Sequence, residues 1–466
     1  MEDWIDLEFS TLKFGDPRVD RHGRKIIRTL SKKPQATISQ AFNTGSECKC
    51  CYEFFANGKV TWQKILQPHQ EATLTRIKEQ PIVLLPVDTS SLNYTSKPSI
   101  NDIGAIANKN TGIFIHPMLA ITPERLHLGI VDARIWARKD SKSDLTTHEL
   151  YALPKEEKEI FRWIKSYEIA CKVAQECPET QVIMMTDREG DFAELFEEID
   201  RMKASGRSAD LIVRSAHNRT IKGLQDQEKT LLRNYLKSST SIGEVTFTIP
   251  SATGRPERTV TQVLKAGAVT FKKRYTSCAI ESPEITLNAV MAIEEHPPKD
   301  QEPLMWIFLT TLPVATFEEV KLVVSYYLAR WEIETFFKIL KSGCLIEKRY
   351  LQECESLMSL LAIFLVISWR ILHIQSMSRE FPKISCEAIF SQSEWQATYQ
   401  VIHKKAGIPT EVPTLGEFTI MVARLGGYLN RKNDPPPGAT VLWRGLEKVQ
   451  TYTEAWDTFK SQEKIR

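Results

Sequence analysis

The pattern of apolar and polar positions predicts a mixed sheet with helices in the first half of the chain. Short apolar runs that fit buried strands lie at residues 82–87, 113–120, 126–131, 182–185 and 211–213. Charged and apolar residues recur at helical spacing over 155–174 and 192–202, so we expect helices there. Strands interleaved with helices in this order are typical of an α/β fold.

The pattern changes between residues 221 and 300. Alternating segments, typical of half-exposed strands, lie at 244–249, 260–271 and 285–294. They predict a mostly β subdomain that is inserted into the α/β fold. The earlier pattern then resumes with a strand at 306–310 and a long helix from about 317 to 341, and the chain is mainly helical from about 355 onward.

These patterns predict three domains, which suits a chain of 466 residues. We expect a helical domain at 1–65, an α/β domain at 66–354 that contains the insertion, and a helical domain at 355–466. The longest uncharged apolar run, Leu357 to Trp369, has 13 residues. A membrane span needs about 20, so this run predicts a buried helix and no membrane association.

Composition narrows the class of protein. The chain is 42% hydrophobic, which excludes a mainly disordered protein. Its nine cysteines are scattered and odd in number, which favours a reducing compartment over a disulfide framework. The acidic opening Met1-Glu-Asp-Trp4 does not resemble a signal peptide, so we expect a cytosolic protein.

Net charge is only +3, but segment 11–34 has eight Lys and Arg residues and two Asp residues. Within it Arg21, Arg24, Lys25 and Arg28 recur at helical spacing and share one face. Such a face either grips phosphates or is a solvated charged surface, and the pattern leaves both open.

A second helix carries an unusual polar line. Tyr327, Arg330, Glu334 and Lys341, here called the signature residues, fall within one narrow arc of the predicted 317–341 helix. The rest of that helix is largely apolar, so we expect it to be buried with the polar line facing a site. The alternative is a polar face in solvent, with Arg330 and Glu334 as a helical ion pair.

Two acids favour the interpretation that the polar line faces a site. Asp88 and Asp187 each follow a predicted buried strand, and α/β sheets commonly place their sites at the carboxyl ends of strands. Three carboxylates on three elements suit two Mg²⁺ ions, which take oxygen ligands and can stabilise an in-line phosphoryl displacement. Arg330 and Lys341 would then bind phosphate. Together these residues outline a site that cuts phosphodiesters.

The signature spacing Tyr327-x₂-Arg330-x₃-Glu334-x₆-Lys341 resembles that of hairpin-forming bacterial transposases of the insertion-sequence-four type, the transposon-five-like family. Three further segments match the same family: Val87-Asp-Thr-Ser-Ser91, Thr186-Asp-Arg-Glu-Gly-Asp191 and Val422-Ala-Arg-Leu-Gly-Gly427. The resemblance runs from Gly15-Asp-Pro-Arg18 to Leu442-Trp-Arg-Gly445, so it covers nearly the whole chain.

The resemblance implies an RNase H-like catalytic core whose DDE triad, Asp88, Asp187 and Glu334, holds two Mg²⁺ ions, with Mn²⁺ as a substitute. It also implies that 221–300 is the family's β insertion. The N-terminal domain would recognise transposon ends, and the C-terminal domain would dimerise.

The same resemblance assigns DNA contacts. Trp306, assisted by Trp331, would stack a base that leaves the helix, since a hairpin requires sharp bending. Tyr327 and Arg330 would grip phosphates near that base, and Lys341 would lie near the cleaved strand end. The remaining implied contacts are Arg214, His217, Arg18, Arg21 and Arg24. The family's basic position after Arg214 is Ala216 here, which leaves Arg219 as a candidate replacement.

The implied activity is cut-and-paste transposition: nicking of the transposon end, hairpin formation, hairpin opening and strand transfer into target DNA. Two DNA ends would be held by a homodimer in the bacterial cytosol, associated with the nucleoid. Three alternatives stay open: a nuclease without strand transfer, a DNA-binding inhibitor of transposition, and a small-molecule phosphohydrolase. The basic N-terminal segment and the three acids argue against the inhibitor. The basic N-terminal segment and the C-terminal helical domain would have no purpose in a phosphohydrolase.

Three other features have ordinary interpretations. We expect Cys48, Cys50 and Cys51 to be small core thiols rather than zinc ligands, because no second pair follows at finger spacing. Asp191 fits either an acid that supports the site around Asp187 or an acid at a helix N-terminus, where the helix dipole favours it, and we favour the helix N-terminus. His116 follows apolar strand residues and fits a hydrogen-bonded core histidine.

Overall fold

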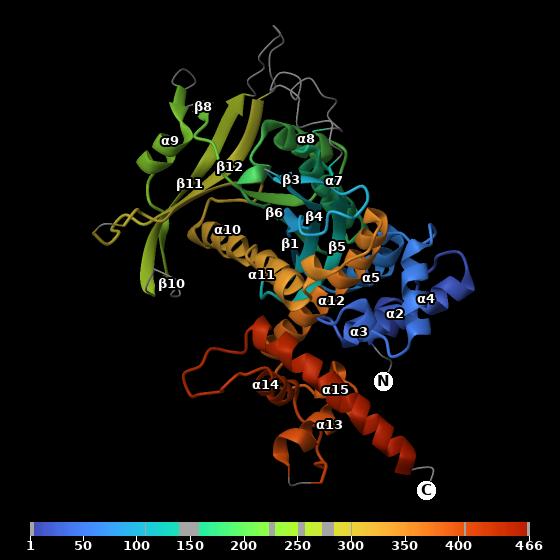
Figure 1. Ribbon diagram of the computed structural model, residues 1–466. Coiled ribbons are helices and arrows are strands. Elements are labelled where there is room, and N and C mark those ends of the chain that lie inside the picture. The colour runs from blue at the N-terminus through green and yellow to red at the C-terminus, as the bar shows by residue number, and fades with distance from the viewer. Residues whose placement is uncertain are drawn as a thin grey trace. The chain divides into compact units, whose positions relative to one another are not determined.

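The computed structural model describes residues 4–107, 109–138, 158–222, 229–249, 257–272, 284–299, 301–404 and 407–463 (Figure 1). Its contacts divide the chain into two compact units. The first unit is Met1–Ile77, Thr89–Thr146 and Glu332–Arg466, and the second is Lys78–Asp88 and Thr147–Trp331. The three domains expected from the sequence stay a prediction.

The second unit is built on a mixed sheet that confirms the α/β expectation for this part of the chain. The strand order is β1 (Ile82–Pro86), β6 (Gln181–Thr186), β7 (Asp210–Arg214), β13 (Met305–Thr310), β12 (Glu284–Ile293), β11 (Arg258–Lys272) and β10 (Gly243–Ile249). β1, β6 and β7 are parallel, and the strands beyond them pair antiparallel. The predicted strands at 82–87, 182–185 and 211–213 are therefore confirmed.

The insertion is mostly β, as predicted, but its long strands extend the core sheet and do not form a separate sheet. β12 pairs along β13, and β11 and β10 follow toward the edge (Figure 1). The short helix α9 (Leu232–Ser238) packs on β11 and β12 with Leu232 and Leu236 buried. β8 (Thr220–Lys222) and β9 (Lys229–Leu231) form a small pair of their own.

Helices α7 (Phe161–Glu176), α8 (Ala193–Ala204) and α10 (Phe317–Ala329) pack against the sheet of the second unit. α10 begins with a capping box in which Thr316 and Glu319 satisfy each other's backbone N–H groups. The expectation of one continuous helix over 317–341 is wrong. Tight three-residue hydrogen bonds, such as Arg330 N–H to Tyr327 O at 3.0 Å, end α10 before α11 (Glu332–Lys338) begins.

The first unit has its own antiparallel strands. β4 (Asn110–Ile121) pairs with β5 (His127–Trp136), β2 (Ser90–Asn93) and β3 (Gly104–Ala107). β2 and β3 have only four residues each, and β2 is mostly polar, so the sequence pattern did not reveal them. His116 on β4 is a buried, hydrogen-bonded residue, as predicted, and its Nδ1 lies 2.8 Å from the Thr89 hydroxyl.

Helix α12 (Cys354–Glu380) contacts β5 and forms the centre of the first unit. It is long and apolar enough to cross a membrane, yet 89% of its most apolar stretch is buried inside the protein. The prediction of a buried helix at Leu357–Trp369 is therefore confirmed. A π turn (Ile339–Gly343) and a 3₁₀ turn (Ile346–Lys348) connect α11 to α12.

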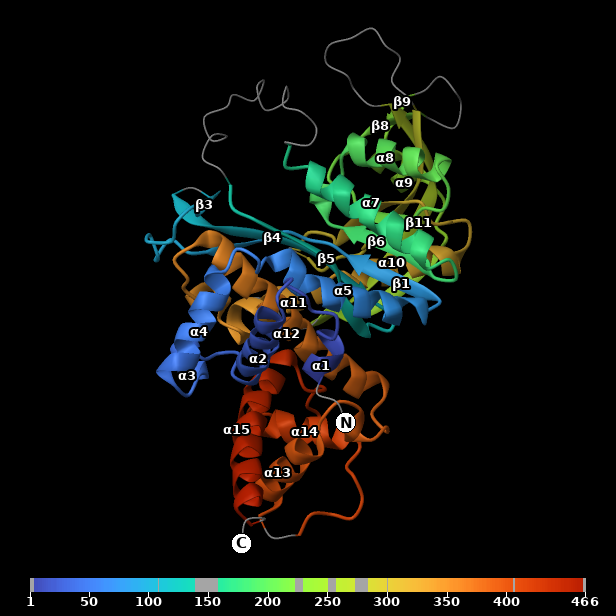
Figure 2. The same ribbon diagram turned by 90° about the vertical axis from the view of Figure 1, so that its right-hand side faces the viewer.

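The remaining helices of the first unit come from the two ends of the chain. The N-terminal group is α1 (Trp4–Glu8), α2 (Pro17–Lys32), α3 (Ile38–Ala41), α4 (Gly45–Ala56) and α5 (Trp62–Lys78). The C-terminal group is a 3₁₀ turn (Cys386–Ala388), α13 (Gln392–His403), α14 (Leu415–Leu425) and α15 (Ala439–Glu463), in which α13 and α14 pack along α15 (Figure 2). Both groups are helical, as the sequence predicted.

Candidate active site

Asp88 and Asp187 lie at the same edge of the second unit's sheet. Asp88 comes two residues after the end of β1, and Asp187 directly follows β6. These strands are parallel neighbours with Pro86 opposite Met185, and the Val87 N–H donates to the Met185 carbonyl at 3.0 Å. Both side chains are partly exposed. The structure thus brings two of the predicted acids together at the carboxyl ends of adjacent strands.

A tight turn holds Asp187 in place. Its Oδ1 accepts the Glu189 N–H at 2.8 Å and caps the 3₁₀ turn Arg188–Gly190. Gly190 has no room for a side chain, because a Cβ atom there would lie 2.2 Å from the Thr186 hydroxyl oxygen. The turn therefore depends on glycine at this position.

Arg330 connects α10 to this edge. Its Nη1 donates to Asp88 Oδ2 at 3.0 Å, although the two residues are 242 positions apart in the sequence. Arg330 is only 4% exposed, so the alternative of a solvent-facing Arg330 is wrong. A buried guanidinium is costly without a counter-charge, and Asp88 supplies one.

Tyr327 lies one turn before Arg330, and its ring is 5.6 Å from the Arg330 guanidinium carbon. Burial raises the pKa of the Tyr327 phenol, while the nearby charges of Arg330 and Arg214 lower it and that of Asp187 raises it. The net shift is upward, so the phenol is protonated at neutral pH. The charges of Arg330, Arg214 and Asp187 thus all act on a buried hydroxyl.

An aromatic row extends from Tyr327 to the edge strand of the insertion. Phe308 contacts Tyr327 with ring centroids 4.5 Å apart, and Trp306 lies 6.4 Å from Phe308. Phe247 on β10 stacks on Trp306 at 5.6 Å and 18°. Sequence reasoning missed Phe247, although alternation within 244–249 already marked it as a half-buried strand residue. Trp331 is about half exposed and lies beside the Arg330 guanidinium.

Arg214 is the last residue of β7 and lies opposite Phe308 in the sheet. His217 is exposed in the following loop. That loop is held by Asp191, whose Oδ2 accepts the N–H groups of Ala216 and His217 at 2.6 and 3.0 Å. The prediction that Asp191 serves a helix N-terminus is wrong, because its acceptor oxygens are directed at this loop.

The suggestion that Arg219 replaces a lost DNA contact stays a prediction, and the structure gives this side chain a partner within the protein. Arg219 forms an ion pair with Asp191 at 2.5 Å, and its side chain is mostly buried. Its guanidinium carbon lies 5.4 Å from the Phe196 ring and 5.3 Å from the Phe271 ring. Arg219 therefore supports the protein's own loop.

Glu334 and Lys341 belong to the first unit. Glu334 is exposed on α11, and Lys341 is half-buried in the π turn that follows. The grouping of Glu334 with the two aspartates stays a prediction. Among the residues that the structure describes, no three or more His, Cys, Asp or Glu side chains are arranged as a metal-binding group. Of the cysteines expected to be core thiols, Cys51 is buried, but Cys48 and Cys50 are only partly buried, so the prediction is wrong for these two.

The basic face of α2 lines an open hollow of about 440 Å³ in the first unit. Arg28 pairs with Asp6 at 2.6 Å, Lys25 pairs with Glu47 at 2.8 Å, and Arg24 donates to the Ser10 carbonyl at 3.1 Å. Arg18 and Arg21 are exposed and form no ion pair with any described residue. Of the predicted N-terminal contacts, these two have free guanidinium groups.

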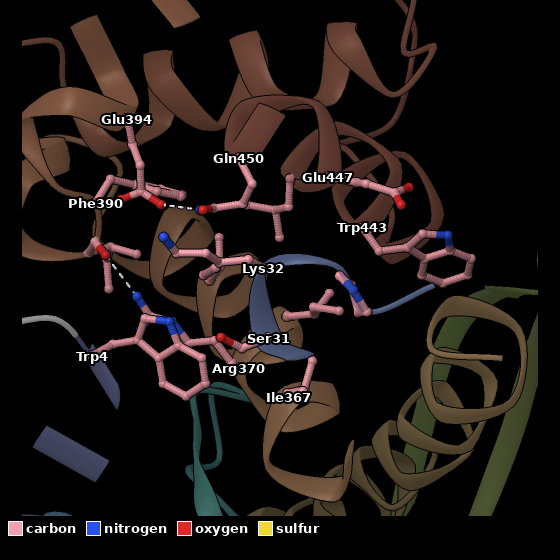
Figure 3. Close-up of a pocket in the computed structure, with 15 residues that line it drawn as sticks. Trp4, Ser31, Lys32, Ile367, Arg370, Phe390, Glu394, Trp443, Glu447 and Gln450 are labelled. Atoms are coloured by element: carbon pink, nitrogen blue, oxygen red, sulfur yellow. Dashed lines mark hydrogen bonds between the residues drawn. The ribbon is translucent and has the colours of Figure 1, made fainter. Parts of the chain in front are cut away.

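A cavity of about 60 Å³ lies elsewhere in the first unit, between N-terminal residues and helices of the C-terminal part (Figure 3). Trp4, Arg370 and Trp443 line it, and Gln450 donates to Glu394 at 2.6 Å on its wall. It holds none of the signature residues, and it is too small for a nucleotide.

Comparison with known proteins identifies both ends of the chain. Residues 1–60 match the family model "Transposase DNA-binding", and residues 366–464 match "Transposase Tn5 dimerisation domain". These matches support a Tn5-like transposase with a DNA-binding and a dimerisation domain. A solved piggyBac transposase synaptic complex with hairpin DNA aligns with 11% identity and a TM-score of 0.35, over 81% of this chain and 72% of that chain. A similarity this low carries no argument about the site.

We predict that Gly190→Ala destabilises the protein by about 1–3 kcal/mol, because the added Cβ collides with buried Thr186. Urea unfolding measures the change. Gly58→Ala is the control, since no atom lies within 4 Å of the place that its methyl group would take. Equal midpoints for the two variants would contradict the steric argument.

Proposed function

We propose that this protein is a DDE-type DNA transposase that excises its element by nicking, hairpin formation and hairpin opening, and then transfers the ends into target DNA. The observation that carries the proposal is the pair Asp88 and Asp187 at one sheet edge, with Arg330 and Tyr327 beside them. The matches at both chain ends support the transposase class.

The two aspartates fit Mg²⁺. They offer hard carboxylate oxygens, and Mg²⁺ is usually held by one or two carboxylates together with water and substrate phosphates. We propose Glu334 as the third carboxylate, as the resemblance of the spacing Tyr327-x₂-Arg330-x₃-Glu334-x₆-Lys341 to the family signature implies. When bound, two such ions would stabilise the attacking and leaving oxygens of a phosphodiester displacement. Mn²⁺, with similar ligand preferences, should substitute.

The chain's own cations then position the DNA. Arg330 neutralises Asp88 in the free protein and offers a guanidinium that suits phosphate oxygens. Arg214 lies near the same phenol and extends the positive charge along the sheet edge. We propose that Tyr327, Arg330, Arg214 and Lys341 hold the strand at the scissile phosphate, with His217 as a further contact.

Hairpin formation bends the DNA sharply, so a base must leave the stack and needs an apolar platform. Trp306 offers such a platform because Phe247 covers one of its faces and keeps its plane fixed. Trp331 would assist from the end of α10. This platform favours a hairpin-forming transposase over a nuclease that only hydrolyses.

The partners follow from the same proposal. Arg18, Arg21 and Arg24 would contact transposon-end DNA, and a homodimer would hold two ends for transfer into target DNA. The reaction would take place in the bacterial cytosol at the nucleoid.

The deciding experiment is a cleavage assay in Mg²⁺ with DNA from directly beside this reading frame, read on native and denaturing gels. A nick followed by a hairpin is expected. Hydrolysis without a hairpin would favour the nuclease, and tight binding without cleavage in Mg²⁺ or Mn²⁺ would favour the inhibitor.

In that assay Asp88→Asn, Asp187→Asn and Glu334→Gln should abolish cleavage while DNA binding persists, since each removes a proposed metal ligand. Glu318→Ala, an exposed acid on α10, is the control and should cut normally. Normal cutting by any of the three variants would remove that residue from the triad.

Trp306→Ala should reduce hairpin formation more than first-strand nicking, because only the hairpin step needs the unstacked base. Trp136→Ala is the matched control: Trp136 also stacks on a phenylalanine, Phe114, at 5.3 Å and 18°, but in the first unit. Equal losses in both steps for Trp306→Ala would refute the stacking role.

Arg21→Ala should flatten the salt dependence of end binding by about one unit of slope, because a phosphate contact is lost. Arg28→Ala, whose guanidinium is already paired with Asp6, should change the slope less. The measurement is DNA affinity across a series of salt concentrations. An unchanged slope for Arg21→Ala would mean that Arg21 does not contact a DNA phosphate.

A further inference from the structure

Asp191 is a buried acid that the proposed chemistry does not use. Its side chain is 0% exposed, and its Oδ2 accepts three hydrogen bonds from consecutive residues. The donors are the Ser215 hydroxyl at 3.2 Å, the Ala216 N–H at 2.6 Å and the His217 N–H at 3.0 Å. One carboxylate oxygen thus anchors the start of the loop Ser215–Arg219.

The end of the same loop is anchored by the same residue. Arg219 forms an ion pair with Asp191 Oδ1 and also donates to the Asp191 carbonyl at 2.9 Å. The rings of Phe196 on α8 and Phe271 on β11 flank its guanidinium. A buried ion pair with this many partners holds its elements in one arrangement, since a half-satisfied one would be costly.

The sheet orients the first residues of the loop. The Ser215 N–H donates to the Ile307 carbonyl on β13 at 2.7 Å, and Arg214 lies opposite Phe308. Arg214 at the end of β7 and His217 in the loop therefore belong to one segment that is held on two sides.

The N–H groups of Ala216 and His217 determine how the loop can contact a phosphate. Adjacent N–H groups that point at one site commonly bind an anion such as phosphate. Here an internal carboxylate already occupies that place, so these amides are not available to DNA. The loop can meet a phosphate only through its side chains.

The anchor is close in sequence to the proposed chemistry. Asp191 follows Asp187 by four residues, across the turn that Asp187 caps. One short segment thus carries a proposed metal ligand and the acid that places the neighbouring loop.

We propose that Asp191 is a positioning residue that holds the loop Ser215–Arg219. In this position Arg214 and His217 contact the DNA backbone while the strand lies at Asp187. The proposal rests on the proposed function, because the partner is DNA. A loop that is ordered before binding loses less entropy on association, so the anchor should strengthen DNA binding.

The test compares Asp191→Asn and Asp191→Ala with Asp210→Asn. Asp210 is the matched control: it accepts from Thr311 and Gln181, both at 2.8 Å, at the opposite end of β7. Hydrogen exchange of the free protein should show faster exchange of the Ala216 and His217 amides in the Asp191 variants only. If Asp191→Ala does not fold, Asp191→Asn, which keeps the shape and one acceptor oxygen, carries the comparison.

The second readout is affinity for the duplex from beside the reading frame. Asp191→Asn should weaken binding about tenfold, and His217→Ala should add little on top of it, because both act through one loop. Asp210→Asn should bind within about twofold of the wild type. A general loss of stability would not produce this difference in affinity between the Asp191 and Asp210 variants.

The outcomes separate the two proposals. Wild-type affinity in Asp191→Asn, or strictly additive losses with His217→Ala, would overturn the positioning role while leaving the transposase proposal intact. A wild-type protein that neither binds nor cuts this DNA would overturn the proposed function, and the positioning role with it.

Discussion

The ion pair between Arg330 and Asp88 is the interaction on which the site depends. A buried guanidinium needs a carboxylate, and the nearest end of the sheet provides it. Because Asp88 lies two residues after β1 and β1 pairs with β6, the same contact places the end of α10 at the sheet edge that carries Asp187. Tyr327 and Arg214 then share the electrostatic surroundings of that edge. The contact joins a helix, two strands and their charges into one arrangement.

The strands of the insertion belong to the same sheet, and this decides which residues they contact. Its strands continue outward from β13, so Phe247 at the edge strand reaches Trp306 and, through Phe308, the phenol of Tyr327. A separate subdomain would not place an aromatic row against the charged edge. The extended sheet thus brings the stacked pair Trp306 and Phe247 and the charged edge into one unit, as the proposed binding of bent DNA requires.

The two ends of the chain match family models for DNA binding and dimerisation, whereas the proposed chemistry lies in the middle. The middle segment carries its own internal support: Asp187 caps the turn that leads to Asp191, and Asp191 anchors the loop that presents His217. Acids on one short segment thus serve two purposes, proposed metal binding and loop placement. The proposed DNA contact of His217 and the proposed metal ligand Asp187 therefore depend on the same short segment.

The sequence by itself determined the features that depend on local periodicity. Apolar runs located β1, β6 and β7 with acids at two of their ends, alternation located the strands of the insertion, and an uncharged run located the buried helix α12. The polar line on an apolar helix also predicted that Arg330 would be buried. Only the tertiary structure decided the partners: Asp88 for Arg330, Phe247 for Trp306, and the loop amides and Arg219 for Asp191. It also ended α10 at Arg330, within a segment whose pattern is continuously helical. The reason is that burial follows from a residue's immediate neighbours in sequence, whereas a partner is chosen by contacts between segments that periodicity does not relate.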